Sequence, residues 1–594
     1  MNKPIPATCG AAFLLLCLAA ECPVVAQSCT MVGATAFGTW TKANSPYCVT
    51  TNVTVGALTI DAGVRVLIDP GKVITVANGL VVRGTEADPV LFTERSSGQG
   101  WGGIVFSTSN TPSTIEHCII ERSTNGGVTI TNALPVFRHC RLRGNTTSAN
   151  GGGMYASIGA GTLRLEDCVL QENGARGHGG GVFAILAAGA TLQMDRCELL
   201  ANKCNATNAV GGAGVQNWGG GLYISGDGVL RNCRIRQNEA WTHAYGCSTQ
   251  YGQGGGIYAG SGSLVIEHCV VVDNLASGQG AGSGCPLGAH GRGGAVAKSD
   301  GALTMRNSII AGNRVRAEYS CCGGTLTRSG SGVWLGAAAS AVMDHCTFAL
   351  NLNHAIQSEA TAVAVTDSIL YFNHEIAGNP PTYGAQMAGT ITASHSDVHN
   401  GYAGMGNINA DPFFLRRDLA IGGLVIHPVS PCVDAGDPAA LPEVAFPPCR
   451  GGSRSDMGAH GGSLAGAFTA PALMVGGAQR YGRGLGGANT LDLAWVPQAG
   501  SLNGRIVARG ATPASPGALL IGIGEAEMSF GAATLLVDPA GLGLVPLPFD
   551  NLGELSLPFD LAQSALLGIP VHLQATSFPS AGLVASNGLV LLFY

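Results

Sequence analysis

The sequence predicts an all-β protein, in which a parallel β-helix is followed by a small C-terminal β-sandwich. The first observation behind this is a pattern that recurs nine times between residues 118 and 373: an apolar residue, two variable residues, then Cys or Ser. Asn follows five positions later in eight of the nine copies. Successive copies are 22, 28, 29, 36, 36, 39, 38 and 22 residues apart. A constant core with a variable period indicates a solenoid whose coils carry insertions at a loop.

The second observation is strand-like alternation within each copy. Leu192 and Met194 alternate with the polar residues Gln193 and Asp195, which is the period of a half-buried strand. The third observation is composition, because Val, Ile, Thr and Gly are abundant and residues that favour helices are sparse. The 90 glycines follow no three-residue period, which excludes collagen.

Stacked coils place like residues above one another, so the recurring positions form columns. The Cys/Ser column is expected to be an interior ladder of small side chains, and the Asn column an amide ladder. Neither column is interpreted as a cofactor site. The Cys/Ser positions are Cys118, Cys140, Cys168, Cys197, Cys233, Cys269, Ser308, Cys346 and Ser368. The Asn positions are Asn145, Asn173, Asn202, Asn238, Asn274, Asn313, Asn351 and Asn373. Glycine triplets such as 179–181 mark a tight corner of each coil.

The N-terminus is typical of an exported protein. Residues 1–26 combine a charge at Lys3, a ten-residue apolar stretch and a small-residue cleavage site, which together predict a signal peptide. The apolar stretch is too short to span a bilayer, and no later segment predicts a membrane helix. A net charge of -6 gives no basic footprint for nucleic acid. The mature protein is therefore expected to be secreted, extracellular or attached to the cell surface. Its oligomeric state is left open.

Residues 27–100 are predicted to form an N-terminal cap with the first coils, and residues 101–461 the β-helix with its stacked insertion loops. The end of this region is the most specific part. Segments 409–414, 430–438 and 456–459 read NADPFF, SPCVDAGDP and DMGA. Together they resemble the closing signature of the choice-of-anchor Q family, which covers about residues 45–461 of this chain. The resemblance implies an exported right-handed parallel β-helix similar to polymorphic outer-membrane proteins. It implies no chemistry.

The remainder of the chain is divided by composition. Residues 462–489 are rich in Gly and Ala and are predicted to be a linker. From residue 490 to 594, alternating stretches such as 491–495 and 589–594 predict a β-sandwich of about 100 residues.

The chain offers few candidates for catalysis. Glu166 and Asp195 are predicted to lie on adjacent coils, where their carboxylates could approach the separation of about 5 to 5.5 Å found in retaining glycosidases. Arg138 and Arg231 occupy the same outward column, which favours an ordinary ladder of alternating charge. His117 and His139 are also predicted to stack, but no third ligand at a fixed spacing points to a metal. No catalytic, metal or cofactor site is therefore assigned.

Four consecutive coils carry an insertion at the same corner, so their loops are predicted to stack as one lobe. The lobe gathers aromatic and polar residues suited to a sugar or protein partner: Trp241, His243, Tyr245, Tyr251, His290 and Tyr319. Its extra cysteines predict disulfides that constrain loops without a core. The expected pairs are Cys204 with Cys247, Cys285 with Cys321 or Cys322, and, at the two ends of the solenoid, Cys29 with Cys48 and Cys432 with Cys449.

These features favour an exported, non-catalytic β-helix protein that presents a binding or adhesion surface at the cell envelope. Extracellular polysaccharide or a surface protein is the expected partner. The alternative is a polysaccharide lyase or glycoside hydrolase that acts on extracellular polysaccharide, because many β-helix proteins are such enzymes.

Overall fold

The computed structural model describes the solenoid together with the strands of the C-terminal region. The described residues are 29–107, 111–207, 216–245, 249–281, 288–319, 325–376, 382–414, 424–426, 429–440 and 454–464, followed by the C-terminal strands named below. The predicted signal peptide, residues 1–26, and most of the predicted linker lie outside them. No helix in the described residues is long and apolar enough to cross a membrane.

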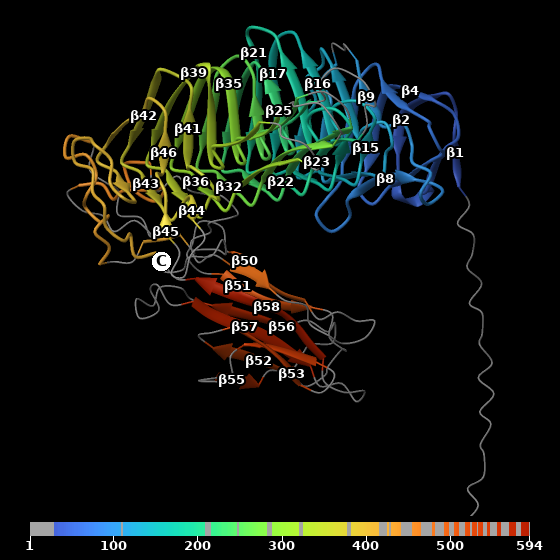
Figure 1. The fold of residues 1–594 in the computed structure, drawn as a ribbon. Coiled ribbons are helices and arrows are strands. Elements are labelled where there is room, and N and C mark those ends of the chain that lie inside the picture. Colours follow the sequence, from blue (N-terminus) through green and yellow to red (C-terminus); the bar gives the residue numbers. More distant parts are fainter. Residues whose placement is uncertain are drawn as a thin grey trace, which may run out of the picture.

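Parallel strands stack rung upon rung along the solenoid, as Figure 1 shows from blue to yellow. One sheet lies along one side of every coil. Its strands, in order, are β1 (Thr30–Val32), β3 (Tyr47–Val49), β5 (Arg65–Ile68), β8 (Val90–Glu94), β11 (Cys118–Glu121), β14 (Arg141–Arg143), β18 (Val169–Gln171), β22 (Glu198–Leu200), β27 (Arg234–Arg236), β32 (Val270–Val272), β36 (Ile309–Ala311), β40 (Thr347–Ala349), β43 (Ile369–Tyr371) and β48 (Asp397–Val398).

A second sheet of 22 strands supplies the other two sides of the coils. Its strands are β2 (Thr35–Trp40), β4 (Val53–Asp61), β6 (Ile74–Val76), β7 (Leu80–Arg83), β9 (Ile104–Phe106), β10 (Thr114–Glu116), β12 (Val128–Thr131), β13 (Val136–Arg138), β16 (Met154–Ile158), β17 (Gly161–Glu166), β20 (Val182–Leu186), β21 (Ala190–Asp195), β25 (Leu222–Ser225), β26 (Asp227–Arg231), β30 (Ile257–Ala259), β31 (Leu264–Glu267), β35 (Val296–Arg306), β39 (Val333–Asp344), β41 (Ile356–Ser358), β42 (Ala362–Thr366), β46 (Met387–Ala388) and β47 (Thr392–Ser394). A short 3-10 helix, η1 (Lys42–Asn44), precedes β3, and a hairpin of β44 (Glu375–Ile376) with β45 (Thr382–Tyr383) follows β43.

The interior of the solenoid follows the predicted alternation. In β21, Ala190, Leu192 and Met194 are buried, while the residues between them are half-buried. The Cys and Ser side chains of the recurring pattern are also buried and belong to the same interior. Because every coil repeats this arrangement, one continuous apolar core runs from Ala36 to Val398.

The predicted Asn ladder is confirmed, and the bonds between its side chains all run from one coil to the next. The Nδ2 of Asn202 donates to the Oδ1 of Asn238 at 3.0 Å, and the backbone N–H of Asn202 donates to the same oxygen at 3.0 Å. The second Nδ2 hydrogen of Asn202 reaches the carbonyl of Leu170 in the preceding coil. The same bonds recur from Asn145 to Asn373, so each amide joins three successive coils.

The four predicted insertions do stack as one lobe, and they do so as two further parallel sheets. We call these sheets the insertion lobe. The first contains β15 (Thr146–Thr147), β19 (Gly174–Ala175), β23 (Lys203–Thr207), β28 (Glu239–Tyr245), β33 (Leu275–Ala281) and β37 (Arg314–Tyr319). The second contains β24 (Gln216–Trp218), β29 (Gln250–Gln253), β34 (Ala289–Arg292) and β38 (Leu326–Ser329).

The lobe is held by close contact between its two sheets. Thr242 Oγ1 donates to the carbonyl of Tyr251 at 2.8 Å and accepts the N–H of Asn217 at 3.1 Å. A Cβ atom on Gly252 would lie 2.3 Å from the carbonyl oxygen of Ser277, so glycine is required at this approach. Stacked sheets with small interior side chains therefore constrain the described part of the lobe.

The disulfide predictions are confirmed at one end and corrected elsewhere. Cys29 and Cys48 are bonded, with their Cα atoms 5.8 Å apart. Cys204 and Cys432 are buried free thiols, so the predicted bonds of Cys204 with Cys247 and of Cys432 with Cys449 are wrong. Cys204 pairs in register with Ala175 and Ala240 and shares their inward position. Cys432 Sγ instead donates to the carboxylate of Asp397 at 3.2 Å. The remaining predicted partners, Cys247, Cys285, Cys321, Cys322 and Cys449, lie outside the described residues.

A second apolar core forms outside the solenoid, which the sequence analysis did not predict. The outward residues of the early coils are often charged, as in Arg141, Arg143 and Glu198, whereas those of β32, β36 and β43 are apolar. The late chain packs on this apolar face through residues that include Phe414, Leu424, Ile426, Cys432 and Met457. The outer surface of the last coils is therefore interior to the protein.

Residues 430–440 and 454–464, which we call the closing segment, fold back along the coils. The two parts join each other, because Met457 N–H donates to the carbonyl of Cys432 at 2.9 Å. Asn307 Nδ2 donates to the carbonyls of Ala459 at 3.1 Å and Gly461 at 2.8 Å. The motifs that carry the family resemblance thus lie against several successive coils at the end of the solenoid.

The described strands of the C-terminal region pair antiparallel. One sheet contains β49 (Ala478–Tyr481), β58 (Val584–Leu592), β57 (Pro570–Ser577), β52 (Gly517–Gly522) and β55 (Gly543–Pro546). A second contains β50 (Asp492–Pro497), β51 (Gly504–Arg509) and β56 (Leu555–Phe559), and β53 (Glu525–Phe530) pairs with β54 (Ala533–Val537). The all-β prediction holds here, while the arrangement of these sheets as a sandwich stays a prediction.

Replacing Asn238 by Ala is expected to lower the free energy of unfolding by about 3 to 5 kcal/mol, because it removes four buried bonds and leaves two donors of Asn202 without acceptors. Urea unfolding monitored by circular dichroism measures the loss. Asn353→Ala, at a half-buried residue outside the ladder, removes two bonds, one to the carbonyl of Arg328 and one from the N–H of His354, and serves as the control. A loss below about 1 kcal/mol for Asn238→Ala would contradict the ladder's role.

The Cys ladder gives a second expectation. Replacing Cys233 by Leu overpacks a fully enclosed position and is expected to cost about 1 to 3 kcal/mol. Cys233→Ser is expected to cost less, because Ser308 already occupies the same column and donates to the carbonyl of Arg306 at 2.8 Å. Thermal unfolding of both variants tests the order. A harmless Leu combined with a damaging Ser would refute it.

Candidate functional site

The two acids considered for catalysis are neighbours in the structure, but both are engaged in ion pairs. Glu166 of β17 and Asp195 of β21 are register partners. The guanidinium of Arg138 bonds Glu166 at 2.8 Å and Glu116 at 3.2 Å, and Arg196 pairs with Asp195 and Asp167. Both carboxylates are thus bonded by guanidinium groups of the same surface. The expected ladder of alternating charge therefore describes this face.

The predicted histidine pair is also present. The rings of His117 and His139 stack with centroids 4.5 Å apart and planes 11° from parallel. In the described part of the chain, no third metal-ligating side chain gathers with them.

The six residues predicted to bind a ligand divide between the two sheets of the lobe. Tyr251 and His290 lie on the second sheet and stack at 4.6 Å. Trp241 lies on β28 of the first sheet, between the buried residues Ala240 and Thr242. Because side chains alternate along a strand, Trp241 points away from the interior that encloses these two residues. The backbones of His243, Tyr245 and Tyr319 lie in β28 and β37, and their side chains are outside the described residues.

A larger group of rings lies where the second lobe sheet meets the body of the solenoid. The residue two positions after each glycine triplet points outward, and the register stacks Tyr155, Phe183, Tyr223 and Tyr258. Their successive centroids are 5.4, 4.6 and 5.3 Å apart. Two coils beyond Tyr258 in the same column, after Ala297, Trp334 continues the apolar strip.

Rings from the lobe meet this strip from the other wall. Trp218, at the end of β24, stacks on Tyr258 at 4.7 Å and on His178 at 4.8 Å. Side chains that precede the glycine corner thus interleave with side chains that follow it. We call this group the aromatic corner; its members are Tyr155, His178, Phe183, Trp218, Tyr223, Tyr258 and Trp334, joined by Tyr251, His290 and Arg292.

Polar groups border the corner at few points. The guanidinium of Arg292 lies over the rings of Trp334 at 4.7 Å and Tyr251 at 5.3 Å, distances typical of cation–π contact. Trp334 Nε1 donates to Glu359 at 3.3 Å, and Tyr258 donates to Ser299 Oγ at 3.1 Å. The corner therefore combines buried and half-buried rings with one cation and a carboxylate.

Burial sets the protonation behaviour of the corner. It lowers the pKa of His178 to about 4, and it raises the pKa of Tyr223, an effect to which neighbouring Tyr258 adds. His178 is consequently neutral near pH 7, and the corner carries its positive charge on Arg292. A neutral aromatic surface bordered by a few polar groups is the composition of sites that bind neutral or weakly charged ligands.

The sequence prediction shares Tyr251 and His290 with the aromatic corner but did not include its other members. Its signal was present, since each glycine triplet is followed by pairs such as Met154-Tyr155 and Leu222-Tyr223. The pattern did not predict the angle between the lobe and the body of the solenoid, and the stacking of Trp218 on Tyr258 depends on that angle.

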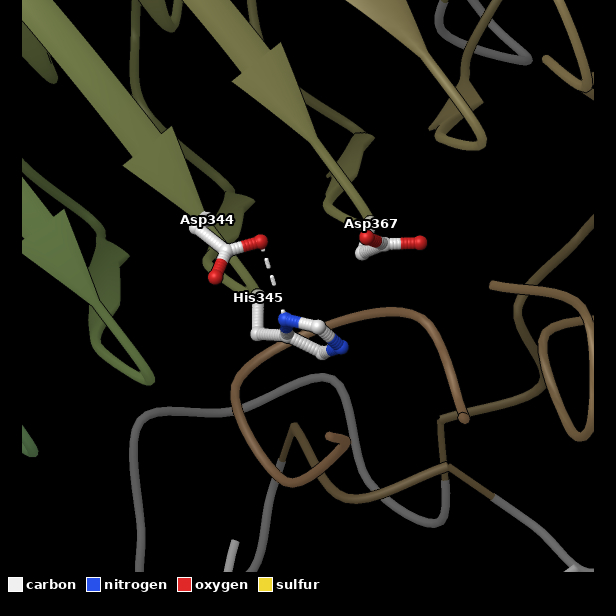
Figure 2. Close-up of side chains that lie close together, drawn as sticks. All are labelled: Asp344, His345 and Asp367. Atoms are coloured by element: carbon white, nitrogen blue, oxygen red, sulfur yellow. Dashed lines mark hydrogen bonds and ion pairs between the residues drawn. The ribbon is translucent and has the colours of Figure 1, made fainter. Parts of the chain in front are cut away.

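One group of side chains in the described residues has the composition of a metal site. Asp344 and His345 lie at the end of β39, and Asp367 follows β42 in the next coil (Figure 2). Their possible ligand atoms all lie within 4.8 Å of one another, and His345 Nδ1 is 3.0 Å from Asp344 Oδ1. The cluster is separate from the aromatic corner and lies against the closing segment, since Gly458 N–H donates to the carbonyl of Asp367.

A family model described as the right handed beta helix region matches residues 72–221. The solenoid is a right-handed β-helix. Among solved structures, the chain is similar to a tailspike protein, gp49 of Acinetobacter baumannii bacteriophage Fri1, described as a capsular polysaccharide depolymerase, with 10% identity and a TM-score of 0.23. That comparison covers 89% of this chain and 78% of the tailspike. No curated protein sequence matches the chain.

Acid is expected to destabilise the protein in part through His178. Its pKa is about 4 in the folded state and about 6.5 in an unfolded chain, so the unfolded state binds more protons between these values. The contribution is complete above about pH 6.5 and is lost as the pH falls towards 4, by at most about 3 kcal/mol. Unfolding of the wild type and of His178→Phe at pH 7.5 and 4.5 measures it.

The expected result is a smaller loss of stability on acidification in His178→Phe than in the wild type. His139→Phe changes an exposed ring of the same type and is the matched control. Equal pH dependence in all three proteins would show that His178 is not buried as described.

Proposed function

We propose that this protein is an exported, non-catalytic binding protein of the cell envelope, and that its aromatic corner binds extracellular polysaccharide. The observation that carries the proposal is the convergence of Trp218, from the lobe, with Tyr223 and Tyr258, from the body. Aromatic rings bordered by a few hydrogen-bonding groups provide apolar contact for sugar rings and polar contact for their hydroxyls.

The elongated form of the corner supports a polymeric ligand. Its stacked rings run across successive coils from Tyr155 to Tyr258, with Trp334 beyond, and strands in neighbouring coils are spaced about 4.8 Å apart. A surface that repeats along one direction suits a ligand that also repeats. Arg292, over Trp334, is paired with Glu359 at 4.0 Å, so this end of the corner offers a donor and an acceptor for sugar hydroxyls.

The proposal of a non-catalytic role is supported by the engagement of the acids. Glu166 is bonded by Arg138, and Asp195 by Arg196, on the face where a catalytic pair was considered. Export and cell-surface attachment are proposed from the N-terminal sequence and from the resemblance to the choice-of-anchor Q family. The mutual packing of the segments around Cys432 and Met457 supports that resemblance, because the signature closes the solenoid as one unit.

Affinity electrophoresis of the purified chain in gels containing acidic or neutral polysaccharides tests the proposal. Trp218→Ala and Tyr223→Ala are each expected to weaken binding about tenfold, which corresponds to ~1.4 kcal/mol of lost ring contact. Phe37→Ala removes an aromatic side chain that is 74% exposed and lies outside the corner, so it is the control.

Three results decide between the alternatives. Undiminished retention of both corner variants would refute the site. Absence of retention by every polysaccharide would refute the ligand class. Release of reducing ends or of unsaturated sugars during incubation, abolished by Glu166→Gln or Asp195→Asn, would instead establish a glycoside hydrolase or lyase.

A further inference from the structure

The cluster of Asp344, His345 and Asp367 is built by the stacking of two coils. His345 and Asp367 both occupy the turn that precedes the Cys/Ser position, with φ values of 48°. Asp344 ends the strand before that turn, and Thr366 of the next coil donates its hydroxyl to Asp344 Oδ1 at 2.9 Å. Consecutive coils therefore place two carboxylates near one imidazole, and Figure 2 shows Asp344 bonded to His345 with Asp367 beside them.

Comparison with an earlier coil shows what is unusual here. Asp167 occupies the same turn position, and Arg196 of the following coil bonds both of its oxygens at 2.8 and 2.9 Å. The residue that follows Asp367 in this column is His395, whose ion pair is directed to Asp437. Among the described ion pairs none joins Asp367 to Arg or Lys. A carboxylate that is 4% exposed and lies beside another carboxylate is thus without a compensating guanidinium.

A second, independent feature adjoins the carboxylate. Ser455 is 1% exposed, and its Oγ has no hydrogen-bond partner in the described structure. A Cβ atom on Gly436 would lie 2.2 Å from this Oγ and 2.9 Å from Asp367 Oδ1. The serine hydroxyl and the aspartate carboxylate therefore both lie beside Gly436. Buried hydroxyls are normally hydrogen-bonded, and an unsatisfied one beside an acidic group indicates a missing ligand or water.

We propose that Asp344, His345 and Asp367 form a binding site for a divalent transition-metal ion, with Zn²⁺ as the best-suited ion. One imidazole and two carboxylates are donors that zinc accepts in tetrahedral sites, with a fourth position left for water. The imidazole disfavours Mg²⁺ and Ca²⁺, which prefer oxygen ligands alone. Ligand atoms that lie up to 4.8 Å apart must move inwards on binding, and the partly exposed Asp344 gives the ion access from solvent.

The position of the site assigns the ion a structural role. The closing segment contacts the same residues, because Asp437 N–H bonds the carboxylate of Asp367 and Gly458 N–H bonds its carbonyl. Ala459 N–H is held in turn by Thr347 Oγ1 at 3.0 Å. An ion on Asp367 fixes the side chain on which this segment rests, so metal binding and docking of the closing segment are coupled.

Calorimetric titration of the untagged full chain with Zn²⁺, after removal of metal by a chelator, tests the site. One equivalent is expected to bind, and Asp344→Asn, His345→Gln and Asp367→Asn are expected to weaken binding at least about tenfold. Asp195→Asn, at the position equivalent to Asp344 in an earlier coil, and His139→Gln are matched controls that should bind like the wild type. Titrations with Mg²⁺ and Ca²⁺ are expected to show no comparable binding.

Hydrogen exchange tests whether the bound ion also stabilises the docking of the closing segment. Zn²⁺ is expected to slow exchange at the amides of Gly458 and Ala459 in the wild type and to leave it unchanged in Asp344→Asn. Asp344 makes no described bond to the closing segment, so this variant tests the site even if Asp367→Asn fails to fold. Failure of the wild type to bind Zn²⁺, or equal binding by Asp344→Asn, would overturn the site. Binding without protection of these amides would overturn the coupling.

Discussion

The stacking of equivalent residues at one fixed spacing is the constraint on which the rest of this structure depends. The backbone N–H and the side-chain amide of each ladder asparagine bond the next coil, as Asn238 does with Asn274, so neighbouring coils cannot slip in register. Once the register is fixed, every outward position becomes a column as well. The charge ladder at Arg138, the aromatic corner and the acid–histidine cluster are all columns of this kind.

The sequence predicted the features that depend on this repeat alone. The inward Cys column, the Asn ladder and the lobe on four consecutive coils follow from spacing, and the structure confirms each of them. The second core was not predicted, although the outward residues Val272, Ile309 and Tyr371 are apolar. Outward apolar residues do not predict a core unless the segment that covers them is also recognised. That segment begins more than 40 residues after Tyr371 and has no periodicity of its own.

The site was harder to predict than the fold because it depends on angles between elements. Tyr251 and His290 were found through their presence in the insertions, but Trp218 contacts Tyr258 only because lobe and body meet at a glycine corner. The same reasoning explains the error at Cys204. An insertion was assumed to lack a core, whereas its strands extend the stacking outwards and enclose that thiol between Ala175 and Ala240.

The Asn ladder also has a direction. Each described bond between two side chains of the ladder is donated towards the C-terminal end, from Asn145 at one end to Gln386 at the other, while the second Nδ2 hydrogen of each Asn returns to a carbonyl of the preceding coil. Aligned amides in a low-dielectric interior polarise one another, so the column behaves as a row of dipoles whose bonds strengthen cooperatively. Gln386 completes the row by returning its own amide to the carbonyls of Asn373 and Gly384. The row of side-chain amides therefore ends in hydrogen bonds to two backbone carbonyls. These bonds satisfy the last amide without a charged residue.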